Sequence, residues 1–191
     1  LALCLIDIDQ DQDLDLLIGT GGNENPIQIQ KYPVRLYINE GNHHWSRATN
    51  FPNIYTSTKS ISAEDINKDG RVDFFIGGQI VPGHFGLNPK SYLIYNKENG
   101  FVIDSSNKNL FEHGMIQKAI WNDLDGDGWK DLIVTGHWME TQYYKNNQGT
   151  LAPSPIKISA SGWWNHLEIF EINKNEKWMI LGNLGTNSRY R

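Results

Sequence analysis

Asp123-Leu-Asp-Gly-Asp-Gly-Trp-Lys-Asp131 is one of three nine-residue stretches that share a pattern of oxygen-bearing side chains. The other two are Asp7-Ile-Asp-Gln-Asp-Gln-Asp-Leu-Asp15 and Asp65-Ile-Asn-Lys-Asp-Gly-Arg-Val-Asp73, and successive copies begin 58 residues apart. Asp or Asn occupies positions 1, 3, 5 and 9 of each copy. Such a loop can wrap a hard cation that takes about six to eight oxygen ligands. The repeat therefore predicts both a metal site and a repeated architecture.

Calcium is the cation that this pattern favours. Closely spaced carboxylates repel one another, so a bound cation makes the folded loop favourable. Magnesium requires stricter octahedral geometry, and zinc prefers His or Cys, neither of which occurs in the loops. Gly70 and Gly128 at position 6 permit a sharp turn, whereas the first copy has Gln12 there. The alternative is an acidic surface turn that binds no metal, and threefold repetition argues against it.

We therefore expect three Ca²⁺ sites, one in each loop. Position 7 would contribute a backbone carbonyl, from Asp13, Arg71 or Trp129, and the other positions would contribute side chains. The full set of expected ligands is Asp7, Asp9, Asp11, Asp13, Asp15, Asp65, Asn67, Asp69, Arg71, Asp73, Asp123, Asp125, Asp127, Trp129 and Asp131.

The surroundings of the loops predict strands rather than the helices of an EF-hand. Position 12, where an EF-hand carries Glu, is Ile18, Ile76 or Val134. An apolar, β-branched run follows each loop and a second apolar segment precedes it, so each loop is expected to join two strands of a hairpin. Third strands ending in Asn and then Gly follow, and fourth strands are expected near residues 44–48, 101–104 and 151–158.

Four strands in each repeat are typical of a propeller blade. The predicted fold is an all-β propeller of four-stranded blades, of which this chain covers about three and a half, at approximately 1–58, 59–115, 116–161 and 162–191, the last incomplete. A fourth loop carries Glu171, Asn173 and Asn175 at positions 1, 3 and 5 but no acid at position 9, so no tight metal site is expected there.

Composition limits the possible partners. The formal net charge of the 191 residues is −5, and twelve of the 22 acidic side chains lie in the three loops. The acidity therefore belongs to the metal sites, and no nucleic-acid partner is indicated. The single cysteine, Cys4, excludes an intrachain disulfide. No transmembrane stretch occurs, and a chain that opens inside a repeat is expected to be a piece of a longer protein.

Two features suggest a ligand-binding rim. Six of the seven tryptophans lie between Trp121 and Trp178, where they either stack on sugars or fill the packing between blades. The first two repeats carry longer connections, residues 21–34 and 79–90, which serve either recognition or the covering of an edge. Trp163, Trp164 and His84 are the candidate rim residues.

The runs Gly19-Thr-Gly-Gly-Asn-Glu24 and Ser161-Gly-Trp-Trp-Asn165, with the acidic loops, resemble FG-GAP/VCBS repeats, the propeller modules of integrin α-subunits. The chain is most similar to bacterial secreted proteins related to ASPIC/UnbV and cartilage acidic protein. The resemblance implies calcium between the first two strands of each blade. It also implies seven blades, the rest coming from missing sequence or self-association.

The same resemblance implies an extracellular, periplasmic or outer-surface location and a scaffold for binding or adhesion to a protein or carbohydrate ligand. It supplies no catalytic residues, and we expect none. Two other interpretations remain open: the propeller part of a polysaccharide-acting enzyme of the lyase or dehydratase type, and a purely structural spacer.

Overall fold

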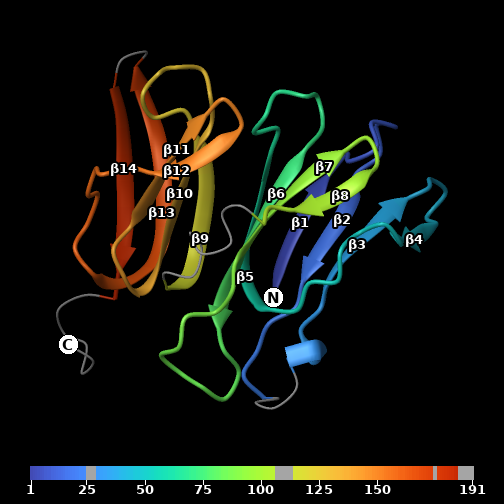
Figure 1. Ribbon diagram of the computed structural model, residues 1–191, viewed down its shortest axis with the longest axis horizontal. Helices are drawn as coiled ribbons and strands as arrows, with labels where there is room; N and C mark the ends of the chain where they lie inside the picture. Colours follow the sequence, from blue (N-terminus) through green and yellow to red (C-terminus); the bar gives the residue numbers. More distant parts are fainter. Residues whose placement is uncertain (25–28, 106–113, 174–175, 185–191) are drawn as a thin grey trace.

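The computed structural model describes residues 1–24, 29–105, 114–173 and 176–184, which are organised almost entirely as antiparallel sheets (Figure 1). Blade 1 consists of β1 (Ala2–Ile6), β2 (Asp15–Gly19), β3 (Val34–Asn39) and β4 (Trp45–Arg47). Blade 2 consists of β5 (Ser57–Glu64), β6 (Asp73–Ile80), β7 (Tyr92–Lys97) and β8 (Gly100–Ile103). Both sheets run in chain order, so each is a four-stranded meander.

The third sheet repeats this order and gains a further hairpin. Blade 3 consists of β9 (Met115–Asn122), β10 (Asp131–Met139), β11 (Gln142–Asn147) and β12 (Thr150–Pro153). The hairpin of β13 (Gly162–Asn173) and β14 (Glu176–Asn183) follows, and β13 pairs with the end of β10. Within the described ranges the one helix is the 3-10 turn η1 (Ile29–Lys31), and no helix is long and apolar enough to cross a membrane. The all-β fold of four-stranded blades is thus confirmed.

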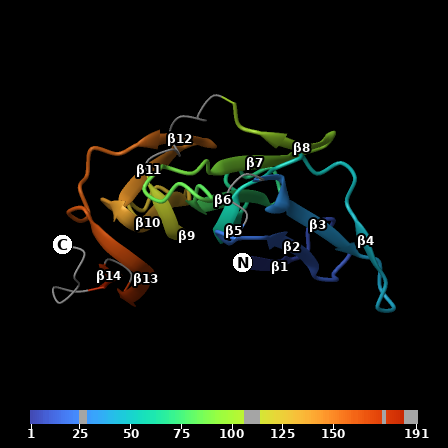
Figure 2. The ribbon, with the colours of Figure 1, turned by 90° about the horizontal axis from the view of Figure 1, so that it is seen from below.

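The blades stack face to face, which explains why their central strands contain consecutive apolar residues, such as residues 74–76 of β6. In β6, Phe74 and Ile76 pack into the cluster between blades 1 and 2, whereas Phe75 packs into the cluster between blades 2 and 3. Side chains alternate between the two faces of a strand, and both faces are covered here. Figure 2 shows the three sheets side by side, each turned relative to the next.

A glycine in the second strand allows close contact with the next blade. A Cβ on Gly19 would lie 2.5 Å from Thr58 Cγ2, and a Cβ on Gly77 would lie 2.6 Å from Ile116 Cγ2. Thr58 and Ile116 lie in the first strands of blades 2 and 3, 58 residues apart like the glycines. The repeat therefore includes this packing contact as well as the loop.

The expected strand bounds agree with the structure except in the fourth strand of blade 3. The sequence predicts a strand over residues 151–158, but β12 ends at Pro153. Pro153 and Pro155 have no N–H group to donate to a ladder, which accounts for the early end. The segment that follows leads to β13 without regular structure.

Candidate metal centre

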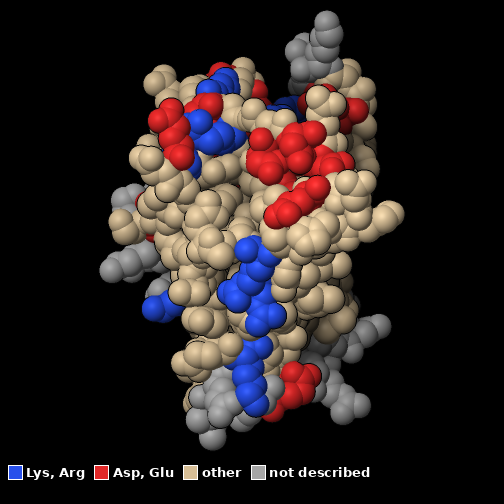
Figure 3. All heavy atoms as spheres, turned by 90° about the vertical axis from the view of Figure 1, so that its right-hand side faces the viewer, with Lys and Arg blue, Asp and Glu red and all other residues tan. Residues whose placement is uncertain are grey.

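All three acidic loops lie at the same end of the molecule, the upper end in Figure 1, which we call the loop rim. Each loop joins the first and second strands of its blade, as the sequence predicts. From the side that Figure 3 shows, the largest group of acidic atoms lies at this end. The opposite rim carries the connections between second and third strands.

The three loops share a backbone with left-handed residues at positions 4 and 6. The φ angles are 66° and 75° at Gln10 and Gln12, 58° and 84° at Lys68 and Gly70, and 78° and 85° at Gly126 and Gly128. The sequence indicates the turn at position 6 but not the one at position 4. Gln12 adopts the left-handed conformation that glycine provides more easily, so the first loop keeps the common geometry with some strain.

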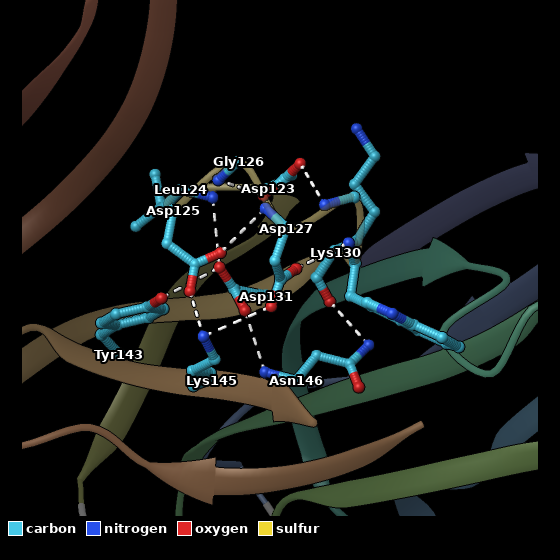
Figure 4. A network of polar contacts seen from close by, with 12 residues as sticks. Asp123, Leu124, Asp125, Gly126, Asp127, Lys130, Asp131, Tyr143, Lys145 and Asn146 are labelled. Atoms are coloured by element: carbon cyan, nitrogen blue, oxygen red, sulfur yellow. Dashed lines mark hydrogen bonds and ion pairs between the residues drawn. The ribbon is translucent and has the colours of Figure 1, made fainter. Parts of the chain in front are cut away.

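The carboxylate at position 1 organises each loop by accepting backbone N–H groups. Asp7 accepts from Asp11 and Gln12 at 3.2 and 3.0 Å. Asp65 accepts from Asp69 and Gly70 at 3.1 and 2.8 Å. Asp123 accepts from Gly126 and Gly128 at 2.8 and 2.9 Å, as Figure 4 shows in part.

The carboxylate at position 5 holds the following turn in the same way. The oxygen acceptors Asp11, Asp69 and Asp127 each receive the N–H of position 7, at 2.8, 2.9 and 2.9 Å. Because each of these carboxylates bends the backbone around itself, their oxygens are gathered at one point rather than spread over the surface.

The Asp at position 9 is fully buried and lies at the base of its loop. Its two oxygens accept different backbone N–H groups, one from position 2 of the loop and one from the third strand of the blade. Asp131, for example, accepts from Leu124 at 3.1 Å and from Asn146 at 2.9 Å, and Tyr143 Oη donates to it at 3.0 Å (Figure 4). Asp15 and Asp73 make the two equivalent backbone contacts.

The partner of position 9 is an Asn that sequence reasoning treated only as a turn residue. Asn39, Asn96 and Asn146 occupy the same place in β3, β7 and β11. The Asn146 amide donates to the carbonyls of Ile66 and Lys130 and accepts from Gly149, so it joins blade 3 to the loop of blade 2. The signal that could have revealed it is an Asn two to four residues before the Gly that follows every third strand.

The donor atoms converge in the first and third loops. Each of Asp7, Asp9 and Asp15 offers a carboxylate oxygen within 4.8 Å of the others, and the same is true of Asp123, Asp125 and Asp131. In the second loop Asn67 holds position 3, so its amide oxygen takes the place of one carboxylate. This set consists of hard oxygen donors, which fits Ca²⁺.

Burial makes an ionised carboxylate unfavourable at the base of two loops. Desolvation raises the pKa of Asp73 to about 7 and also raises the pKa of Asp131. Desolvation, with the neighbouring charges of Asp15 and Asp11, raises the pKa of Asp9. A divalent cation beside these groups would favour their charged forms, so the electrostatics are those of a cation site.

Cationic side chains contact two of the loops. Lys145 Nζ contacts the carboxylate of Asp125 and lies 3.3 Å from Asp127 Oδ2, and Arg71 Nη2 lies 3.1 Å from Asp69 Oδ2. In the described part of the chain, no salt bridge reaches an acidic residue of the first loop. The loops thus share their backbone but differ in local charge.

Neighbouring loops also touch one another through position 4. Gln10 Nε2 donates to the Gly70 carbonyl at 2.6 Å, which joins the first loop to the second. Lys68 Nζ lies 4.2 Å from the ring centroid of Trp129, which joins the second loop to the third. The loop rim is therefore a continuous row of contacts.

The fourth loop differs from the other three. Glu171 pairs with Lys177 at 3.6 Å, and the Asn173 amide donates to Glu176 at 3.0 Å. Asn175, the expected ligand at position 5, lies outside the described residues. Glu171 and Asn173 are thus engaged within their own hairpin.

On the opposite rim, one candidate tryptophan belongs to an aromatic cluster formed by blade 2, blade 3 and the hairpin that follows blade 3. Trp163 lies 5.3 Å from Trp138 and 6.4 Å from Phe85, centroid to centroid, and Phe85 lies 4.8 Å from Trp138. Trp138 has a φ of 56° and is 49% exposed, and Phe85 is 58% exposed. We call Phe85, Trp138 and Trp163 the aromatic platform; sequence reasoning missed Phe85 and Trp138 because they are distant in the chain.

The other two rim candidates directly adjoin members of this platform in the chain but make different contacts. His84 lines a pocket of about 600 Å³ between blades 1 and 2, together with Tyr55, Tyr92 and Lys90. Trp164 donates its indole N–H to the Ala160 carbonyl at 3.1 Å. The structure therefore brings Trp163 together with residues of blades 2 and 3 but does not bring the three candidates together.

Comparison with known proteins supports the repeat identified from the loops. Residues 7–76 and 123–181 match the FG-GAP-like repeat, so the match includes all three acidic loops and the fourth hairpin. No curated protein is similar enough to the chain to count as a relative. Because the matched residues make up more than half of the chain and form the blades described above, the protein belongs to the FG-GAP-like repeat family.

Proposed function

We propose that this chain is a calcium-binding β-propeller module, secreted or exposed at the cell surface, that acts as a binding scaffold rather than as a catalyst. The observation that carries the proposal is the convergence of three carboxylates, within 4.8 Å of one another, in both the first and the third loop. Each convergent group includes a fully buried Asp that is tied to the rest of its blade.

Calcium in this role stabilises the hairpin formed by the first two strands. The ion would be held by positions 1, 3 and 5 and by the buried position 9, so it would connect the loop to the base of the blade. In the second loop the Asn67 oxygen would replace a carboxylate, and the lower ligand charge is expected to weaken binding there.

The stabilisation depends on the calcium concentration around the protein. Sites with dissociation constants of about 10⁻⁴–10⁻³ M are typical of extracellular modules. At millimolar calcium, mass action then contributes on the order of 1 kcal/mol for each site. The proposed location outside the cytoplasm supplies calcium at that level.

Thermal unfolding with and without chelator tests the calcium proposal. We expect chelation to lower Tm by roughly 5–10 °C, since each kcal/mol corresponds to about 2–4 °C for a chain of this size. The double variant Asp123→Asn, Asp125→Asn should reduce the shift by about a third, and Glu98→Gln, an acid outside the loops, should leave it unchanged. A Tm that is the same in chelator and in calcium would contradict the proposal.

The opposite rim supports the binding role. A half-exposed aromatic residue in the left-handed conformation is strained, and such strain persists only where the surroundings impose it. Trp138 is held in this state by Phe85 and Trp163. Exposed rings held in fixed positions can stack on a sugar or receive an apolar side chain, so we propose this rim as the surface for a glycan or protein ligand.

A glycan array and a surface-protein pull-down distinguish the two ligand classes. The parent chain should bind at least one glycan or protein, and Trp138→Ala should lose that binding while Trp45→Ala, exposed on blade 1, should retain it. Equal binding by the parent and Trp138→Ala would remove the aromatic platform from consideration.

A further inference from the structure

The third loop is contacted by a lysine from the third strand of its blade. Lys145, on β11, extends toward the loop and contacts the carboxylate of Asp125, and its Nζ lies 3.3 Å from Asp127 Oδ2 (Figure 4). These two Asp residues hold positions 3 and 5, which are expected calcium ligands. The lysine ammonium therefore contacts the same carboxylate oxygens that a bound metal ion would use as ligands.

The other two loops have no lysine at the corresponding place. Lys145 directly precedes Asn146, the asparagine of the third strand in blade 3. The equivalent asparagines of blades 1 and 2 are Asn39 and Asn96, and they are preceded by Ile38 and Tyr95. Ile38 packs against the cluster between blades 1 and 2, and Tyr95 donates its hydroxyl to the Gly149 carbonyl. Neither side chain can neutralise a carboxylate.

One ammonium and one divalent cation cannot occupy these oxygens together. Their like charges repel at a separation of a few ångströms, so calcium must displace Lys145 to reach Asp125 and Asp127. An exposed ion pair changes an equilibrium constant by about fivefold at most. Lys145 makes two such pairs, with Asp125 and Asp127, and together they correspond to about a three- to tenfold effect. The displaced Lys145 side chain can extend into water, where its ammonium group stays hydrated.

We propose that Lys145 is a built-in counter-ion of the third loop, which holds the loop carboxylates in the absence of calcium and is exchanged for calcium when the ion binds. This inference rests on the proposed calcium function and adds the regulation of one site. The third loop then binds calcium roughly three- to tenfold more weakly than it would without the lysine. It consequently fills at higher calcium than the first loop, which has the same donor types and no cation paired with its described acids.

Trp129 at position 7 gives the third loop a sensitiser of its own. Because Lys68 of the second loop lies over the same ring, the double variant Asp65→Asn, Asp69→Asn is used to exclude emission from terbium in the second loop. Terbium bound in the third loop should give luminescence excited through Trp129, and calcium should displace it. Trp129→Phe identifies the signal, since the emission from this loop should disappear. The calcium midpoint of that displacement is the quantity to compare among variants.

Lys145→Met removes the charge and keeps most of the side-chain length. We expect its calcium midpoint to fall three- to tenfold, Lys145→Arg to stay close to the parent, and Lys97→Met to match the parent. Lys97 is the matched control because it lies on β7 next to Asn96 and over the Tyr95 ring rather than on a loop carboxylate. An unchanged or higher midpoint for Lys145→Met would overturn the inference.

Thermal unfolding separates exchange from a merely structural role. Exchange predicts that Lys145→Met lowers Tm in chelator and enlarges the gain in Tm on adding calcium. A structural role predicts the same loss of Tm in both conditions, which would count against the inference. If the parent shows neither terbium emission nor a calcium-dependent Tm, the calcium proposal and this inference fail together; if only the variant contrast is missing, this inference alone fails.

Discussion

The two rims of this molecule are built by opposite rules. On the loop rim the same nine-residue structure occurs three times, down to the left-handed residues at positions 4 and 6 and the buried Asp at position 9. On the opposite rim the connection between the second and third strands differs from blade to blade. It consists of residues 20–33, including η1, in blade 1, of residues 81–91 in blade 2 and of residues 140–141 alone in blade 3.

The difference separates what every blade needs from what distinguishes one blade from another. Loop-rim side chains satisfy backbone groups within a blade and in the neighbouring loop, so a change there should alter stability. Opposite-rim side chains such as Phe85 and Trp138 are half exposed and contact one another across blades. A change there should alter ligand binding and leave stability nearly constant.

The largest expected effect comes from the buried Asp of a loop. Asp131→Ala leaves the Leu124 and Asn146 N–H groups without their acceptor and should lower the free energy of unfolding by about 3 kcal/mol. Urea unfolding in chelator measures this loss without any contribution from metal. The exposed Asp127→Ala should lose less than about 1 kcal/mol under the same conditions, and equal losses would contradict the distinct role of position 9.

The asparagine of the third strand should have the next largest effect. Asn146→Ala leaves the Ile66 and Lys130 carbonyls and the Gly149 N–H without a partner and should lower the free energy of unfolding by about 2 kcal/mol. Asn147→Ala, at the exposed neighbouring position, is the matched control and should change it by about 0.5 kcal/mol or less. The prediction fails if urea unfolding places the two variants together.

A smaller effect of opposite sign is expected in the first loop. Gln12 occupies a left-handed position that is glycine in the other two loops, so Gln12→Gly should raise the free energy of unfolding by about 0.5–1 kcal/mol. The same replacement at Gln30, outside the loop, should bring no gain. A destabilised Gln12→Gly variant in thermal and urea unfolding would show that the side chain makes a contribution larger than the strain.

The smallest stability effect is expected on the opposite rim. Trp138→Gly loses ring contacts with Phe85 and Trp163 but relieves the strain of the left-handed backbone, since glycine has no Cβ, so the free energy of unfolding should change by about 0.5 kcal/mol or less. Differential scanning calorimetry measures this change. A loss as large as that of Asp131→Ala would remove the division between the rims.

The loop rim could be predicted from the sequence because the geometry of each loop is local. Nine consecutive residues determine each turn, and the apolar runs on both sides determine the hairpin, as with Phe74 and Ile76 after the second loop. The left-handed conformations of Gln10 and Lys68 were not predicted, because glycine is the residue that indicates such a conformation in a sequence.

Contacts between distant residues explain what the sequence did not reveal. Asn146 bonds to a blade 2 carbonyl 80 residues earlier, and its side-chain type alone indicates only a turn. Phe85, in the connection after β6, meets Trp163, on β13, because β13 pairs with the end of β10 where Trp138 contacts both rings, and nothing in either local sequence indicates that neighbour. The early end of β12 was readable from Pro153 and Pro155.

The contacts made by position 4 give the row of loops a direction. Gln10 reaches forward to the second loop, Lys68 reaches forward to the third, and Gly126, at the same position of the third loop, has no side chain with which to reach further. Position 4 therefore joins the first loop to the second and the second to the third. The third loop is joined to the last hairpin in another way, through Lys177 on β14, whose Nζ contacts the Asp123 carbonyl and donates to Asn122 Oδ1 at 3.2 Å. Because each contact stabilises both of its partners, calcium bound in one loop is expected to stabilise its neighbours as much as calcium in them stabilises that loop.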